Sequence, residues 1–181
     1  MIDPIRQPIA FSPLARAYGR GVFCCGDPDI DAWFWKKSWR DHQALKARVT
    51  TAHLPDGTLV GLCALSIAVE RTSELSHDHQ RARSYGSYFP CLEFQYLGVC
   101  SKHQGKGIGT IIIGRVVDTF ADMAMNCGMP MLTLRAANDR VYKFYRNLGF
   151  APYGRAGDRR LLLDAQSAIT VRVGTAPDAR G

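Results

Sequence analysis

The segment from Tyr96 to Thr110 limits the fold of this chain more than any other. Its sequence, YLGVCSKHQGKGIGT, begins as an apolar strand end, passes through a turn with alternate glycines and leads directly into an apolar helix. Glycine adopts backbone conformations that other residues avoid and lets a ligand approach the main chain closely. The first turn of a helix adds N–H groups without partners and the positive end of the helix dipole. The segment therefore predicts a cradle for a phosphate or pyrophosphate.

Two common phosphate-binding motifs do not fit this spacing. A Walker A loop requires Gly-x4-Gly-Lys followed by Ser or Thr, but here a glycine follows Gly105 and Lys106. A dinucleotide fingerprint requires Gly-x-Gly-x-x-Gly, and a threonine occupies the position of its third glycine. What remains is Gln104-x-x-Gly107-x-Gly109. A glycine-rich turn that only lets a strand and a helix pack closely is the alternative interpretation.

The residues after the loop predict the order strand, helix, strand, helix. Apolar residues recur at helical spacing from Ile108, and a Gly-Met-Pro sequence ends that helix after about five turns. Residues 131–135 have the pattern of a short buried strand. Asn138 or Asp139 then caps a second amphipathic helix, which ends at Gly149.

Two motifs in this order resemble the GNAT superfamily of N-acetyltransferases. The Gln104-x-x-Gly107-x-Gly109 sequence resembles the loop that holds the pyrophosphate of acyl-CoA, and Asn138, Tyr145 and a Gly-Phe pair match the pattern of the last helix. The resemblance implies an α/β (α+β) GNAT fold. We expect a mixed, strongly twisted sheet of six to seven strands flanked by about four helices.

The resemblance also implies roles for individual residues. Attack of an amine on a thioester makes an oxyanion, which main-chain N–H groups stabilise, and expels a thiolate, which a general acid protonates. Tyr145 would be that acid, because a tyrosine hydroxyl is protonated at neutral pH. A splay of the strand near Gly98 would free the N–H of Val99 for the acetyl carbonyl. The predicted acetyl-CoA-binding residues are Leu97, Gly98, Val99, Gln104, Gly105, Lys106, Gly107, Ile108, Gly109, Thr110 and Asn138.

Other interpretations of these residues remain open. Tyr145 also fits a core aromatic with a satisfied hydroxyl, and Asn138 fits a helix cap with or without a coenzyme contact. The sequence identifies no general base; Glu93 on the strand before the loop would act through water if it took that role. No metal site is predicted, because the histidines lack metal-ligand spacing apart from His77-x-His79 in a polar loop.

Length and composition set the outer limits. With 181 residues, 46% of them hydrophobic, residues 1–181 are expected to form one domain. Residues 165–181 are expected to add an edge strand over 169–173 or to trail off as a flexible tail. The sequence has no run of about 18 apolar residues and no apolar signal segment at its start. We therefore expect a cytoplasmic protein without a membrane partner.

The N-terminal half adds a finer resemblance. A Cys-Gly turn and an acidic helix start from Phe23 to Trp33, Gln43, and a hairpin with Arg48-Val-Thr-Thr and Leu59-Val-Gly-Leu resemble the opening of GNAT toxins from bacterial toxin–antitoxin pairs. Such toxins acetylate the α-amine of the amino acid on charged tRNA and block translation. The resemblance implies aminoacyl-tRNA as acceptor and a ribbon-helix-helix antitoxin as partner, and it leaves a homodimer open. Tyr96 stands where this family often has an arginine.

The charge balance fits a polyanionic acceptor. The formal net charge is +7, from 23 basic and 16 acidic residues, and lysines and arginines that neutralise phosphates release counterions. A GNAT that acts on a protein, polyamine or small-molecule amine, and a non-catalytic binding module, are the alternatives. The basic residues are Lys36, Lys37, Arg40, Lys46 and Arg48 on or after the first helix, and Arg81, Arg83, Arg140, Lys143, Arg146, Arg155, Arg159 and Arg160 in a second area.

Overall fold

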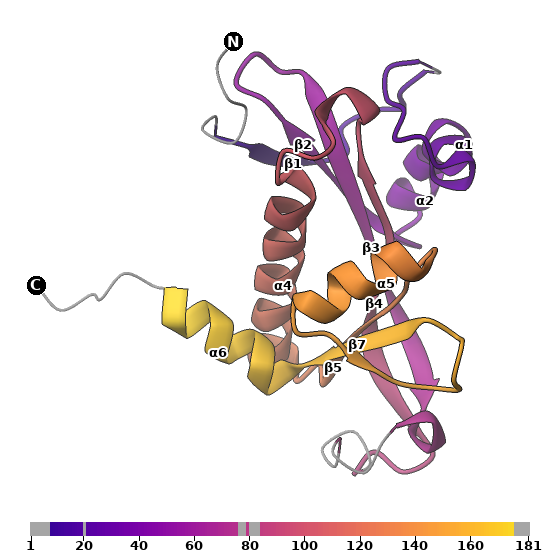
Figure 1. The fold of residues 1–181 in the computed structure, drawn as a ribbon, viewed down its shortest axis with the longest axis vertical. Helices are drawn as coiled ribbons and strands as arrows, with labels where there is room; N and C mark the ends of the chain where they lie inside the picture. The colour runs from indigo at the N-terminus through magenta and orange to yellow at the C-terminus, as the bar shows by residue number, and fades with distance from the viewer. Residues whose placement is uncertain (1–7, 20, 76–78, 80–83, 176–181) are drawn as a thin grey trace, which may run out of the picture. The chain divides into compact units, whose positions relative to one another are not determined.

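The computed structural model describes residues 8–19, 21–75, 79 and 84–175. His77, in the expected polar loop, and Arg81 and Arg83, in the second basic area, lie outside the described residues. In chain order, the elements are β1 Ala10–Pro13, α1 Pro28–Lys36, α2 Ser38–Gln43, β2 Arg48–His53, β3 Leu59–Arg71, the 3-10 turn η2 Thr72–Glu74, β4 Tyr88–Val99, the 3-10 turn η3 Ser101–His103, α4 Ile108–Cys127, β5 Met131–Arg135, α5 Asp139–Asn147, β6 Ala151–Pro152, β7 Arg160–Asp164 and α6 Ala165–Thr175 (Figure 1).

The strands form one mixed sheet in the order β1-β2-β3-β4-β5-β7-β6. Strands β4 and β5 are parallel, whereas β2 and β3 form the antiparallel hairpin that the sequence predicts. The seven strands agree with the expected six to seven, and the described residues contain five α-helices where about four were expected. The prediction of a mixed sheet with this order of elements is therefore confirmed.

The helix starts are those that the capping residues predict. Helix α1 begins after Asp27, whose carboxylate accepts hydrogen bonds from the amides of Asp29 and Ile30 at 3.0 and 3.2 Å. Helix α5 begins after Asn138, whose side-chain oxygen accepts from the amide of Val141 at 3.0 Å. Each cap gives a partner to N–H groups that the first helical turn leaves without one.

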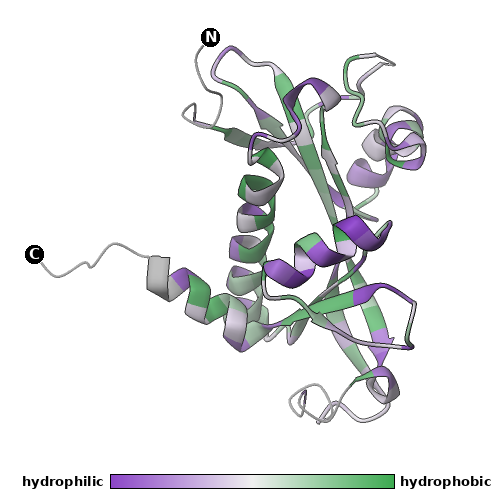
Figure 2. Cartoon of the chain, viewed as in Figure 1, coloured by the Kyte–Doolittle hydropathy of each residue, from purple (hydrophilic) through white to green (hydrophobic). Residues whose placement is uncertain are grey.

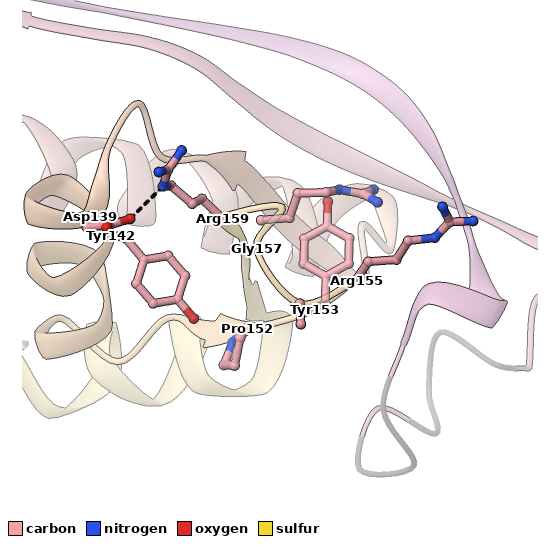
Figure 3. Close-up of a pocket in the computed structure, with 10 residues that line it drawn as sticks. Asp139, Tyr142, Pro152, Tyr153, Arg155, Gly157 and Arg159 are labelled. Atoms are coloured by element: carbon pink, nitrogen blue, oxygen red, sulfur yellow. Dashed lines mark hydrogen bonds and ion pairs between the residues drawn. The ribbon is translucent and has the colours of Figure 1, made fainter.

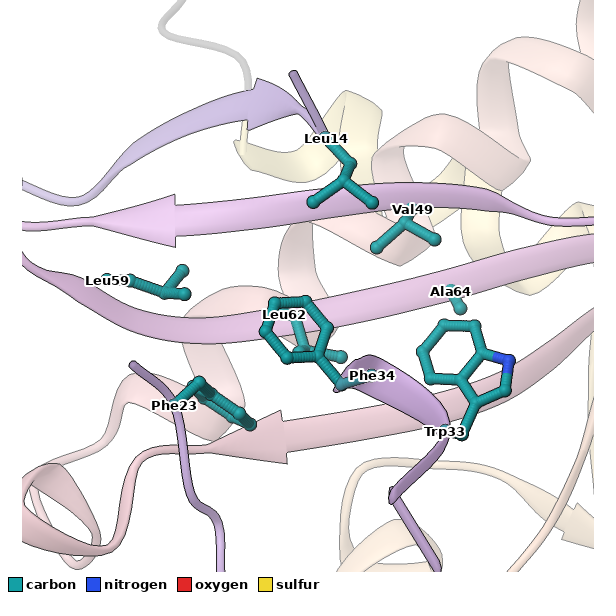
Figure 4. Packing of buried hydrophobic residues seen from close by; sticks show 8 residues of the cluster. All are labelled: Leu14, Phe23, Trp33, Phe34, Val49, Leu59, Leu62 and Ala64. Carbon is teal, nitrogen blue, oxygen red and sulfur yellow. The ribbon is translucent and has the colours of Figure 1, made fainter. Parts of the chain in front are cut away.

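By its internal contacts the chain divides into two compact units, which are described separately. Unit 1 comprises Met1–Ser66 and Gln95–Val116, and unit 2 comprises Ile67–Phe94 and Val117–Gly181. The prediction of one domain over residues 1–181 stays a prediction. Figure 4 shows the buried cluster of unit 1, which is made by Leu14, Phe23, Trp33, Phe34, Val49, Leu59, Leu62 and Ala64.

In unit 2, a second buried cluster includes residues of β4, β5 and β7. In Figure 2, β7 is mainly hydrophobic, whereas α5 is mainly hydrophilic and buries Tyr145. An ionic group borders this cluster: the Arg160 guanidinium contacts Glu70 and Glu74 and lies 4.3 Å from the Tyr153 ring centroid. The cluster itself consists of Leu75, Phe89, Cys91, Met131, Tyr153 and Leu162.

The expectation of an edge strand over residues 169–173 is wrong. Residues Ala165–Thr175 form the helix α6. Asp164 starts it, because its carboxylate accepts from the amide and the hydroxyl of Ser167 at 3.0 and 2.6 Å. The Arg172 side chain then pairs with Asp122 of α4. These contacts outweigh the β-propensity of Ile169, Val171 and Val173. The alternative, a flexible tail over residues 165–181, does not describe Ala165–Thr175, which are helical, and residues 176–181 lie outside the described residues.

Protonation of His42 is expected to weaken the fold at mildly acidic pH. This imidazole is 7% exposed, and its Nδ1 accepts from the amide of Val49 at 3.0 Å. Burial, helped by the charge of Arg48, lowers the pKa of His42 from its ordinary value. The unfolded chain, with a pKa of about 6.5, therefore takes up the proton first as the pH falls. Stability is complete above that pH and decreases as the pH falls towards the folded pKa.

Urea unfolding of the wild type and His42→Asn at about pH 7.5 and about pH 5.5 measures this effect. The asparagine oxygen keeps an acceptor for Val49 but does not titrate. The wild type is expected to lose more of its free energy of unfolding than the variant between the two pH values. Equal losses would show that His42 does not contribute to the pH dependence.

Candidate acyl-CoA site

The loop between β4 and α4 has the backbone of an anion cradle. Gly105 and Gly107 both lie in the left-handed region, with φ of 74° and 77°. The carbonyl of Gly107 accepts from the amide of Ile111 at 3.1 Å, so the helical hydrogen bonds begin at Gly107. The N–H groups of residues 108–110 therefore have no acceptor within their own helix. No atom outside the adjacent residues lies within 4 Å of where a Cβ would stand at Gly105 or Gly107, which leaves room for a ligand against the main chain.

The other two glycines of the segment differ in how closely they are packed. A Cβ at Gly98 would lie 2.9 Å from the ring of Phe23, so the buried aromatic ring requires glycine there. Gly109 lies inside α4, where a Cβ would meet Val99 at an ordinary 3.7 Å. The packing against Phe23 explains the glycine at position 98, whereas the open surroundings of Gly105 and Gly107 fit the cradle interpretation.

The side chain of Gln104 has a structural role that the sequence did not indicate. Its Nε2 donates to the carbonyl of Cys25 at 2.7 Å and to the carbonyl of Val99 at 3.0 Å. Gln104 therefore ties the start of the loop to the end of β4 and to the turn before α1. The residues concerned are 79 positions apart in sequence, so no local pattern predicts the contact.

The electrostatics of the loop fit a diphosphate. The side chain of Lys106 folds back to the carbonyl of Lys102 at 3.3 Å, which keeps its charge on the loop. The first turn of α4, all of which is described, contains no acidic residue. Positive side chains, free helix amides and the helix dipole act in the same direction on a bound anion.

The end of β4 carries the predicted carbonyl-binding residues. β4 pairs in parallel with β5 from Cys91↔Met131 to Phe94↔Leu134 and then continues to Val99. The pairing with β5 thus stops short of Gly98 in the described register, as a splay requires. Unit 1 brings together Leu97, Gly98 and Val99 of β4, Gln104, Gly105, Lys106 and Gly107 of the turn, and Ile108, Gly109 and Thr110 of α4.

Asn138 and Tyr145 belong to unit 2 instead. Asn138 caps α5, as the capping interpretation predicts. Tyr145 is 5% exposed, and its ring meets those of Phe94 and Phe150 edge-on at centroid distances of 6.2 and 5.4 Å. The ring therefore has the core packing that the alternative interpretation describes. The same packing fixes the direction of the phenol, which a proton donor also needs.

Unit 2 also contains an arginine-lined cavity of about 490 Å³ beside α5 (Figure 3). Part of its positive charge is neutralised, because Arg159 pairs with Asp139 at 2.6 Å and Arg160 pairs with Glu70. Arg155, Arg159 and Arg160 of the predicted second basic area line this cavity, but the pairing of two of them with carboxylates lowers its positive charge. Its lining residues are Asp139, Tyr142, Pro152, Tyr153, Gly154, Arg155, Ala156, Gly157, Arg159 and Arg160.

The sequence matches one protein-family model over most of its length. Residues 16–150 match the acetyltransferase (GNAT) family, so the chain belongs to this family of acetyltransferases. A comparison with curated proteins found no match.

Solved structures with the same fold include bacterial GNAT toxins. AtaT complexed with acetyl-methionyl-tRNAfMet superposes with a TM-score of 0.81 at 17% identity, covering 91% of this chain and 99% of that chain. A tyrosine-to-phenylalanine mutant of KacT gives 0.83 at 19% identity, covering 92% and 99%. A mutant AtaT toxin bound to the C-terminus of the antitoxin AtaR gives 0.76 at 17% identity, covering 94% and 99%. These likenesses confirm the GNAT fold that the sequence predicts.

Two structural features concern a membrane and a metal ion. None of the described helices is long and apolar enough to cross a membrane. In the described part of the chain, which excludes His77, no group of three or more histidine, cysteine, aspartate or glutamate side chains is placed to hold a metal ion.

Proposed function

We propose that the chain transfers the acetyl group of acetyl-CoA to the α-amine of the amino acid on charged tRNA, and so acts as the translation-blocking toxin of a toxin–antitoxin pair. The observation that supports acetyl-CoA as the donor is the open main-chain cradle at Gly105 and Gly107, which leads into the start of α4. Enzymes of this family use acetyl-CoA, and a crystal structure of AtaTR contains it.

On the donor side, the main chain does most of the binding. The amides from Gly105 to Thr110 would hold the diphosphate, with Lys106 adding positive charge. The N–H of Val99 would donate to the acetyl carbonyl and stabilise the oxyanion that forms there. Asn138 would contribute through the start of α5 that it caps.

The chemical step then needs one acid. The amine nitrogen bonds to the acetyl carbon, the carbon–sulfur bond breaks, and the Tyr145 hydroxyl gives its proton to the departing thiolate. The proton lost by the amine passes to water, and the phenolate is reprotonated from solvent. The α-amine of an aminoacyl ester is less basic than a lysine amine, so more of it is neutral at pH 7, which reduces the need for a protein base.

Two observations support aminoacyl-tRNA as the acceptor: the net charge of the chain and the ligands of structurally similar proteins. The net charge of +7 supports a polyanionic acceptor. AtaT is bound to an acetylated aminoacyl-tRNA in one solved structure and to its antitoxin in another. At 17% sequence identity, the partners of AtaT cannot be assigned directly to this chain. We therefore propose aminoacyl-tRNA as the acceptor, a ribbon-helix-helix antitoxin as the partner and a homodimer as the assembly.

The alternative acceptor is a protein, a polyamine or a small-molecule amine. One observation favours it: Arg159 and Arg160 of the unit 2 cavity are paired with carboxylates and offer less charge to RNA than their number indicates. This alternative keeps the donor site and the role of Tyr145 unchanged.

Radiolabelled acetyl-CoA separates the two acceptors. With a mixture of aminoacyl-tRNAs, label is expected in the RNA fraction and is expected to leave it on mild alkaline deacylation, because the acetyl group sits on the esterified amino acid. Uncharged tRNA is the matched control and should remain unlabelled. Label that enters peptides or polyamines and never RNA would rule out the toxin and leave the acetyltransferase intact.

A further inference from the structure

A buried carboxylate holds the turn that precedes α1. Asp31 lies in the first turn of α1 and is 5% exposed. Its Oδ1 accepts from the amide of Cys25 at 2.8 Å, and its Oδ2 accepts from the amide of Gly26 at 3.3 Å and from the thiol of Cys24 at 3.2 Å. The amides of Cys25 and Gly26 and the thiol of Cys24 therefore all donate to the same side chain.

The carbonyls of the same turn face the acyl-CoA loop. The carbonyl of Cys24 accepts from the amide and the hydroxyl of Ser101 at 2.8 and 3.0 Å. The carbonyl of Cys25 accepts from Gln104 Nε2 at 2.7 Å, and the same nitrogen donates to the carbonyl of Val99. The Cys24–Gly26 turn is therefore fixed by Asp31 on its donor side and by the loop on its acceptor side.

The carboxylate of Asp31 suits this role because it is ionised in the fold. Burial opposes its ionisation, but hydrogen bonds from Cys25, Cys24 and Gly26 outweigh burial and lower the pKa of Asp31 from its ordinary value. Hydrogen bonds to a charged acceptor are stronger than neutral ones, and hydrogen bonds in a chain polarise one another. Asp31 thus strengthens the carbonyl of Cys25 as the acceptor for Gln104.

We infer that Asp31 is a positioning residue for acyl-CoA binding, which acts through the Cys24–Gly26 turn and the side chain of Gln104 on the backbone from Val99 to Gly107. This inference rests on the proposed function of the loop. Asp31 does not contact the ligand; it holds the turn that orients Gln104, and Gln104 fixes the start of the cradle. An anion cradle made of main-chain amides depends on such support, because small displacements of its N–H groups weaken every contact together.

Binding of CoA itself, measured by calorimetry without any acceptor, tests the inference on the full chain. Asp31→Asn is expected to raise the Kd for CoA by about tenfold, because it removes the charge and one of the two acceptor oxygens. The KM for acetyl-CoA should rise in parallel, while kcat at saturation stays within about twofold, because Tyr145 is unchanged. Asp29→Asn makes the same charge change at an exposed position of the same helix and should leave the Kd unaltered.

A destabilised fold must be separated from a displaced loop. Ser38→Ala removes the buried hydrogen bond from the Ser38 hydroxyl to the carbonyl of Phe34, 2.6 Å long, and lowers stability at a site away from the turn. It should lower the melting temperature and leave the Kd for CoA as in the wild type. If Ser38→Ala weakens CoA binding as much as Asp31→Asn does, the effect is one of general stability and the inference is overturned.

Gln104→Met tests the same connection from its exposed end, where folding is not at risk. If both residues act through one turn, the double variant with Asp31→Asn should bind CoA no more weakly than the weaker single variant. Multiplicative losses would mean that Gln104 and Asp31 act separately and would overturn the inference. A wild type that binds no CoA would instead refute the proposed function of the loop, whereas a wild type and Asp31→Asn with equal Kd would refute this inference alone.

Discussion

Tyr145→Phe is expected to lower turnover by about 10²-fold or more, because it removes only the proton that the departing thiolate needs. The ring should stay in place, since its contacts with Phe94 and Phe150 are made by the aromatic faces and edges that phenylalanine keeps. Steady-state kinetics with saturating acetyl-CoA measure the loss as a fall in kcat. Calorimetry with CoA should give an unchanged Kd, because the loss falls on the reaction step.

Tyr88→Phe is the matched control for this prediction. It removes a tyrosine hydroxyl from the same unit at a position that is 53% exposed. Its turnover should equal that of the wild type. If Tyr145→Phe also turned over at the wild-type rate, Tyr145 would be a core aromatic and the general acid would have to be sought elsewhere.

Gly107→Val is expected to act on the donor side and to raise the apparent KM for acetyl-CoA by about tenfold or more, with a smaller effect on kcat. Valine disfavours a φ of 77°, and its side chain would enter the open space of the cradle. A diphosphate would then lose its close approach to the amides that follow. Initial rates over a range of acetyl-CoA concentrations give the two constants separately.

Gly57→Val separates backbone strain from obstruction of the cradle. Gly57 has a φ of 83° and equally open surroundings, but it lies in the hairpin turn between β2 and β3. Both variants carry a strain on the order of 1–2 kcal/mol, which lowers the melting temperature. Only Gly107→Val should change the KM. A similar rise in both variants would show that strain, and not the cradle, determines the binding of acetyl-CoA.

The parts of the fold that the sequence predicted are those that local chemistry determines. Asp27 and Asn138 cap α1 and α5 as their residue types require, and the predicted strand over 131–135 matches β5 residue by residue. Gly105 and Gly107 adopt the positive φ values for which glycine is suited. In each case the controlling interaction lies within a few residues in the sequence.

The parts that the sequence did not predict depend on distant contacts. Strand β1 forms by pairing with β2 some 40 residues later, as in Ala10↔His53, and its four residues carry little pattern of their own. The role of Gln104 depends on the carbonyl of Cys25, and that of Asp31 on amides earlier in the chain. At α6 the β-branched residues indicated a strand, but the cap at Asp164 and the pair between Arg172 and Asp122 determined a helix.

The proposed cradle is made of peptide groups, which has a consequence for how the surrounding sequence can vary. The peptide unit is the same in every residue. A cradle of this kind therefore requires only two small residues and the start of a helix, and most flanking side chains can change. Solved structures that keep this architecture share only 16–19% of their residues with the chain. The side chains around the proposed cradle can therefore change while its main chain keeps the same path.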